Sequence, residues 1–460
     1  MHKYLILPVL VLLGACSMAP KHTRPAQPVP QEYSHVDADS SWGVAAPKVG
    51  LRDFIIDPRL ETLIETALKN NRDLRIAIAQ IEEARGLYRV QRADRLPNVG
   101  VTGSAARTQG LETGGAEVDR ASIGVGVAAF ELDLWGRVRN LSESARSQYL
   151  ATVAGQRTVQ LTLIRQVAAT YLATVEASER VRLAEATLES RREGLRIAEV
   201  RYKSGITSAL DFRQAESLLM QAETQLAGLR LAQAQAGNAL GVLVGTQVDT
   251  TALPKPLSLH EQVNTVALSP GLPSDLLVTR PDIIAAEERL RSARANIGVA
   301  RAAFFPRIAL TGNLGFASTD LNNLFGGDNQ AWTFGPTLNL PLFDFGRNRA
   351  NVTVAQAREN IAVANYEKTV QTAFREVSDA LAGRRYLAEQ VASQQRGVEA
   401  QREIAELARL RYNEGVVGYL EVLDAERNLF TAEQALLQLR RAEAENLISL
   451  YVVLGGGLIE

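Results

Sequence analysis

Most of the chain carries the hydrophobic and polar pattern of long α-helices. Proline is absent from residue 98 to 253 and from 342 onward, and Ala, Leu, Gln, Glu and Arg dominate most of both stretches. These residue types favour helix, whereas proline breaks it. The pattern predicts three helices in each half: 58–93, 137–203 and 210–244, then 281–303, 347–413 and 419–453. Each middle helix would extend about 100 Å at 1.5 Å per residue, far beyond the usual helix length.

A second pattern lies between the first and middle helices of each half, where apolar residues alternate with small or polar ones. It is clearest from Pro306 to Phe316 and from Trp332 to Leu342, and weaker in the first half. Alternation with period two predicts β-strands, so we expect β-hairpins at 97–134 and 306–343. Each strand would have about ten residues, the length that crosses a bilayer when the strand is tilted.

Four strands would not suffice to form a membrane structure alone. Unpaired backbone groups at strand edges are unstable in hydrocarbon, and small barrels need about eight strands. We therefore expect each chain to supply part of a barrel that other copies complete. Two hairpins of a soluble sheet are the alternative. Where strand gives way to helix, Trp135, Phe343 and Phe345 are candidate membrane-interface aromatics.

The two halves are copies of one unit. At an offset of 210, Arg201-Tyr202 aligns with Arg411-Tyr412 and Gly205 aligns with Gly415, and the register holds without a gap from about residue 135 to 245. Such self-similarity indicates a duplication. We expect repeat 1 at 58–250, a linker at 251–276 and repeat 2 at 277–460.

The N-terminal residues 1–15 have the features of a signal peptide. His2 and Lys3 give a cationic start, an apolar core follows, and Leu13-Gly14-Ala15-Cys16 looks like a bacterial lipobox. We expect cleavage before Cys16 and acylation of Cys16, with 16–57 as a lipidated N-terminal strap. An ordinary secretory signal with a chance cysteine is the alternative.

Composition excludes several kinds of chemistry. The net charge of −1 provides no basic surface for nucleic acid. One cysteine and four histidines, three of them before residue 36, leave no intramolecular disulfide, cysteine-based zinc site or Cys/His catalytic pair. We therefore expect no enzyme activity, no catalytic residue, no cofactor, no metal site and no nucleic-acid partner.

Five short motifs resemble those of a known family. They are Leu-Asp-Leu-Trp-Gly-Arg (132–137), Arg-Pro-Asp-Ile (280–283), Ala-Ala-Phe-Phe-Pro (302–306), Leu-Asp-Ala-Glu-Arg (423–427) and Leu-Gly-Gly-Gly (454–457). With the lipobox and the duplicated helix–hairpin–helix order, they resemble the outer membrane factor family of bacterial efflux pumps, the TolC- and OprM-like channels. The resemblance covers essentially the whole chain.

The resemblance implies an α+β membrane protein that works as a homotrimer. Four transmembrane β-strands per chain would form a 12-stranded β-barrel in the cell outer membrane, continued by a long periplasmic α-helical barrel. The strap and the linker 251–276 would belong to a small equatorial region. Implied partners are outer membrane lipid, a periplasmic adaptor (membrane fusion protein) and an inner-membrane RND-type transporter.

By resemblance, the helical hairpins at 201–211 and 411–421 would lie at the periplasmic tip, close the aperture and receive the adaptor. Spacing places seven residues on one helical face: Leu420, Asp424, Arg427, Thr431, Gln434, Gln438 and Arg441. Asp424 and Arg427 can pair with each other or across chains. A solvated face with ordinary charges is the alternative. The implied gate residues are Leu420, Asp424, Arg427, Tyr412 and Asp211, and the implied adaptor contacts are Arg201, Tyr202, Gly205, Arg411 and Gly415.

Three functions fit these features. The first is the exit duct of a tripartite efflux pump that passes drugs, solvents or other small toxic compounds. The second is the outlet of a type I protein secretion system, and the third is a periplasmic coiled-coil lipoprotein without a pore.

Overall fold

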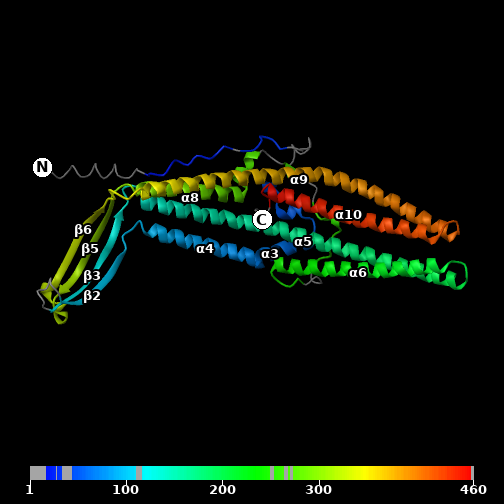
Figure 1. The fold of residues 1–460 in the computed structure, drawn as a ribbon, viewed down its shortest axis with the longest axis horizontal. Coiled ribbons are helices and arrows are strands. Elements are labelled where there is room, and N and C mark those ends of the chain that lie inside the picture. The colour runs from blue at the N-terminus through cyan, green and yellow to red at the C-terminus, as the bar shows by residue number, and fades with distance from the viewer. Residues whose placement is uncertain are drawn as a thin grey trace. The chain divides into compact units, whose positions relative to one another are not determined.

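The computed structural model describes residues 17–26, 28–33, 44–109, 117–248, 253–263, 268–269 and 273–456. The predicted signal peptide, the lipidation site Cys16 and parts of the strap and linker lie outside the described residues. Of the helices that are described, none carries an apolar stretch long enough to cross a membrane. The chain divides into two compact units, and their elements are labelled in Figure 1.

The long helices have the predicted bounds to within one residue. They are α5 (Arg137–Lys203), α6 (Ala209–Val244), α8 (Pro281–Ala302), α9 (Arg347–Asn413) and α10 (Tyr419–Val453). Both α5 and α9 contain 67 residues. Leucine, alanine and long polar side chains sustain helix over this length, and tertiary packing supplies most of the stability.

The predicted helix 58–93 is wrong in one respect, because it consists of α3 (Pro58–Asn70) and α4 (Arg72–Ala93). Asn71 leaves the helical conformation with ψ 135°. Its side-chain oxygen accepts a hydrogen bond from the Leu74 N–H at 2.9 Å, and its amide donates to the Leu243 carbonyl at 2.9 Å. Hydrogen bonds of this kind from an asparagine side chain compete with the backbone hydrogen bonds of a helix. The helix is therefore interrupted at Asn71 without a proline or glycine.

The first unit contains the described residues of 1–27, 79–154 and 284–368. Its sheet has four antiparallel strands in the order β2 (Val99–Gln109), β3 (Glu117–Leu132), β5 (Arg307–Ser318) and β6 (Gln330–Asn339). The central strands approach so closely that a Cβ on Gly315 would collide with the Ile123 carbonyl oxygen. Among the described strands, β2 and β6 each pair on one side only, so the sheet has two open edges.

The first described part of the strap, residues 17–26, lies against α8 within this unit. The Arg24 guanidinium donates to Glu287 at 2.8 Å, and Arg294 donates to the Thr23 carbonyl at 2.6 Å. His22 bridges the same two side chains, at 3.1 Å from each. Burial alone would raise the pKa of Glu287, but the hydrogen bonds from His22 and Arg24 outweigh it and lower this pKa.

The second unit contains the described residues of 28–78, 155–283 and 369–460. Within it, α5 and α6 form one antiparallel pair, and α9 and α10 form another (Figure 1). Its core includes the stacked rings of Phe54 and Tyr451, 4.4 Å apart. The Tyr451 hydroxyl donates to the Val49 carbonyl at 2.7 Å, which fastens an N-terminal segment to the last long helix.

Candidate functional site

The two helical hairpins of the second unit have the same turn. Gly205 and Gly415 adopt φ of 69° and 74°, the left-handed conformation that glycine adopts without strain. The Gly205 N–H donates to the Tyr202 carbonyl at 3.0 Å, and the Gly415 N–H donates to the Tyr412 carbonyl at 3.0 Å. This is the usual way a helix ends at a glycine. The duplication therefore extends to the backbone of the tips.

The helices that leave the two turns begin differently. In α6, the Asp211 N–H donates to Ser208 Oγ at 3.3 Å, and the Asp211 carboxylate accepts from the Ser208 N–H at 3.3 Å. This reciprocal arrangement is a capping box. In α10 the corresponding position is Gly418, which makes no side-chain cap. The structure thus gives Asp211, a predicted gate residue, a local bond at the start of its own helix.

An aromatic cluster joins the hairpins to each other. The Arg201 guanidinium carbon lies 4.4 Å from the ring centroid of Tyr412, a cation–π distance. Tyr412 is buried against Tyr419, with ring centroids 5.1 Å apart. Burial raises the pKa of Tyr419. Tyr202 stacks on Phe212 within the first hairpin, at 5.6 Å. Within one chain, Tyr412 therefore contacts Arg201 and Tyr419.

The predicted gate residues of α10 lie in solvent within this chain. Leu420 is 56% exposed. Asp424 Oδ1 lies 2.9 Å from Arg427 Nη2, and these side chains are 52% and 66% exposed. Arg411, a predicted adaptor contact, forms an exposed ion pair with Glu421 at 2.5 Å. Exposed ion pairs of this kind stabilise the fold by about 0–1 kcal/mol each. They can therefore exchange partners at a small cost in free energy.

The polar face predicted for α10 turns toward α5 in its second half. Arg180 donates to the Gln434 amide oxygen at 2.8 Å, and Arg441 lies 3.1 Å from the buried carboxylate of Glu176. A spacing of 3.5 residues drifts by about 20° per heptad on a helix of 3.6 residues per turn. Two members of this face, Gln434 and Arg441, therefore contact α5 within the chain, whereas Gln438 is exposed.

A buried ion pair that the sequence analysis missed lies behind the exposed one. The Glu426 carboxylate is 2.8 Å from Arg191 of α5 and 2.6 Å from Arg409 of α9. Arg191 is only 6% exposed and Glu426 15%. Glu426 thus binds three long helices together. It belongs to the motif 423–427, but nothing in the spacing along the chain indicates that Arg191 is its partner.

The predicted interface aromatics of the first unit have different surroundings. Trp135 stacks on Phe305 at 4.6 Å, and its indole N–H donates to the Pro306 carbonyl at 3.0 Å. Phe343 and Phe345 are fully exposed in the single chain. Within the described part of the chain, no group of three or more His, Cys, Asp or Glu side chains could hold a metal ion.

The long paired helices and the open-edged sheet define a class of protein, the outer membrane channel. A model of the outer membrane efflux protein family matches residues 63–246 and again 272–456. The chain is 43% identical to the solvent efflux pump outer membrane protein SrpC of Pseudomonas putida, covering 97% of each chain. It is 41% identical to the cation efflux system protein CusC of Escherichia coli strain K12, covering 98% of each chain.

A solved structure shares the whole fold. The open state of the MtrE outer membrane channel of Neisseria gonorrhoeae matches with a TM-score of 0.88 and 38% identity, covering 96% of this chain and 99% of that chain. The chain belongs to the outer membrane efflux protein family. The family resemblance and the fold class predicted from the sequence are confirmed.

Proposed function

We propose that the chain is the exit duct of a tripartite efflux pump in the cell outer membrane. It would receive compounds from an inner-membrane RND-type transporter and a periplasmic adaptor, and release them outside. The match of both halves to the efflux family carries this proposal. Relatives are named for solvent, toluene and cation efflux, which supports small toxic compounds as cargo.

The open sheet edges support a homotrimer. β2 and β6 each have one unpaired edge among the described strands, and such edges are unstable in lipid. Three chains that pair β6 with the β2 of the next chain would close twelve strands and leave no edge. Phe343 and Phe345, exposed in one chain, would then lie at the membrane interface with Trp135 nearby.

We assign the parts of the chain as follows. A signal peptide (1–15) precedes a strap (16–57) that acylated Cys16 anchors to lipid, and repeats 1 (58–250) and 2 (277–460) flank an equatorial linker (251–276). The hairpins would form the periplasmic aperture, with Leu420 as the constriction and Asp424 and Arg427 as a weak latch. Arg201, Tyr202, Gly205, Arg411 and Gly415 would face the adaptor.

Conductance tests the duct and its gate together. Purified protein in planar bilayers should form a channel of low conductance, and Asp424→Asn with Arg427→Gln should raise the conductance while the native mass remains that of three chains. Unchanged conductance in the double variant would remove the latch. A stable monomer in detergent would contradict the trimer and favour a lipoprotein without a pore.

Cells that lack the protein separate the two duct functions. Loss of the efflux duct should lower the tolerated concentration of organic solvents and antibiotics, and the wild-type chain should restore it. Loss of a type I secretion outlet would instead abolish export of a reporter toxin at unchanged drug susceptibility, which would overturn the efflux proposal.

A further inference from the structure

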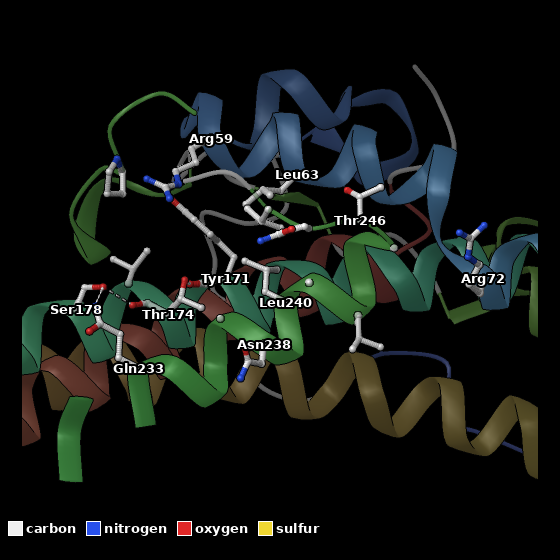
Figure 2. Close-up of a pocket in the computed structure, with 18 of the residues that line it drawn as sticks. Arg59, Leu63, Arg72, Tyr171, Thr174, Ser178, Gln233, Asn238, Leu240 and Thr246 are labelled. Atoms are coloured by element: carbon white, nitrogen blue, oxygen red, sulfur yellow. Dashed lines mark hydrogen bonds between the residues drawn. The ribbon is translucent and has the colours of Figure 1, made fainter. Parts of the chain in front are cut away.

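A cavity of about 810 Å³ lies in the second unit, away from the hairpin turns. It lies between α3, α5, the C-terminal part of α6 and the segment that follows α6 (Figure 2). Sites for small organic molecules usually have volumes of about 300–1,000 Å³. The cavity is therefore large enough for a ligand with a ring system or a short alkyl chain.

Buried hydrogen bonds hold the floor of the cavity in place. Tyr171, from α5, donates to the buried carboxylate of Asp57 at 2.6 Å. The same carboxylate accepts the Arg59 N–H at 2.8 Å and the Leu257 N–H at 3.2 Å. Two turns further along α5, the Ser178 hydroxyl accepts a hydrogen bond from Gln233 of α6 at 3.0 Å, as Figure 2 shows. These bonds connect four segments, so the cavity is formed without a ligand.

Glycines of α6 provide the room. Gly237 and Gly241 line the cavity one helical turn apart. A Cβ placed on Gly237 would meet no atom within 4 Å. Glycine inside a helix is less favourable than alanine by about 1 kcal/mol, and no close neighbour requires it here. The open space at Gly237 is thus maintained against helix propensity.

The charged side chains that line the cavity are all arginines, and the Asp57 carboxylate at its floor already accepts three hydrogen bonds. Arg59, Arg72 and Arg182 line the cavity, and its lining includes no aspartate or glutamate. Arg59 and Arg72 lie toward opposite ends of it (Figure 2). The Arg59 guanidinium donates only weakly, to the Pro254 carbonyl at 3.5 Å. Within the described residues, none of these three arginines has a carboxylate at ion-pair distance. In most ion pairs of this chain, by contrast, the guanidinium nitrogen lies 2.5–3.5 Å from a carboxylate oxygen.

We propose that this cavity binds an amphiphilic organic anion, with an apolar body ending in a carboxylate, sulfonate or phosphate. The buried side chains of Leu63, Val175 and Leu240 offer the apolar surface. Guanidinium groups recognise such acid groups by charge-assisted hydrogen bonds. Among the side chains that line the cavity, a cation would meet only the charges of arginines. The site lies within one chain and does not depend on conduction through a pore.

In the test, sodium 2-naphthalenesulfonate is the probe and is titrated into the full-length protein held in amphipol. Isothermal titration calorimetry measures its binding. We expect saturable binding of one probe per chain, weakened by added salt. The neutral analogue 2-naphthol should bind at least about tenfold more weakly, because it lacks the charged contact. Equal binding of both compounds, or no saturable binding of the sulfonate, would overturn the proposal.

Two kinds of variant locate the site. Gly237→Leu should abolish binding by filling the cavity, whereas Gly228→Leu should bind like the wild type, since Gly228 is equally unobstructed on the same helix but does not line the cavity. Arg59→Gln with Arg182→Gln should weaken binding about tenfold or more. Unchanged affinity in both the Gly237 and the arginine variants would place the probe elsewhere and refute the assignment. If Gly237→Leu did not assemble, the surface arginine variant alone would decide.

Discussion

Replacing Glu426 by glutamine should loosen the α9–α10 hairpin far more than removing the exposed charges beside it. The substitution leaves Arg191, 6% exposed, without its carboxylate. Breaking a buried ion pair from one side destabilises by about 3–5 kcal/mol, and glutamine can still accept a hydrogen bond, so we take about 3 kcal/mol. The matched change Asp424→Asn disrupts a pair that is more than half exposed and should remove about 1 kcal/mol or less.

Amide hydrogen exchange followed by mass spectrometry measures this difference directly. Since 1.4 kcal/mol corresponds to a factor of ten, peptides covering 405–430 should exchange roughly 100-fold faster in Glu426→Gln. In Asp424→Asn the change should stay below about fivefold. Peptides of the first unit serve as the internal control and should be unaffected.

A double substitution separates a buried charge from a general weakening. Arg191→Met combined with Glu426→Leu leaves only Arg409 without a carboxylate; that side chain is 57% exposed and still donates to the Ser190 hydroxyl at 2.9 Å. Replacing a buried pair by apolar residues is often neutral, so protection should return close to the wild-type value. If Glu426→Gln exchanged no faster than Asp424→Asn, or if the double variant were worse than the single one, the burial argument would be refuted.

Three further predictions concern other parts of the chain. Tyr171→Phe should lower the free energy of unfolding by about 1.5–3 kcal/mol, because Asp57 loses a hydrogen bond to its buried charge; an unchanged midpoint of thermal unfolding would contradict this. The pKa of Glu287 is lowered in the folded chain, so its stabilisation of the strap is present above the ordinary glutamate pKa and lost as pH falls through the lowered value. Limited proteolysis should therefore release the strap only at a pH below the ordinary glutamate pKa of about 4.3, and Glu287→Gln should remove that pH dependence. Gly415→Ala should destabilise the hairpin by about 1 kcal/mol through backbone strain alone, since its φ is 74° and a Cβ there meets no atom within 4 Å; Gly415→Asn should lose less, which chemical denaturation can measure.

Local preferences for helix and strand determine most of the elements of the fold. Most of the helices and strands could therefore be predicted from the sequence. The absence of proline defines α5 and α9, and alternation defines β5. The break at Asn71 was missed, because its hydrogen bond to the Leu243 carbonyl joins residues far apart in the chain.

The candidate site was predictable only in part, because some of its contacts join residues that are far apart in the chain. The repeat identified both glycine turns, and a separation of three residues paired Asp424 with Arg427. The partners of Glu426 and the position of Gly237 in the cavity lining depend on how helices pack. The recurrence of glycine at 237, 241 and 245 was the one available signal of an opened helix face.

The unequal starts of α6 and α10 have a consequence for symmetry. Three chains would present six tips whose turns are alike, so their backbones would approximate a sixfold ring. Only the tips of repeat 1 have the Ser208–Asp211 cap, and such a cap is more stable than glycine at the same position, as at Gly418, by a few tenths of a kcal/mol. Firm and loose helix starts would alternate around the ring, which reduces its true symmetry to threefold. A partner made of six identical chains would therefore contact two structurally different kinds of hairpin tip. The three α10 helices, which lack the cap, would be the first to unfold at their N-terminal ends.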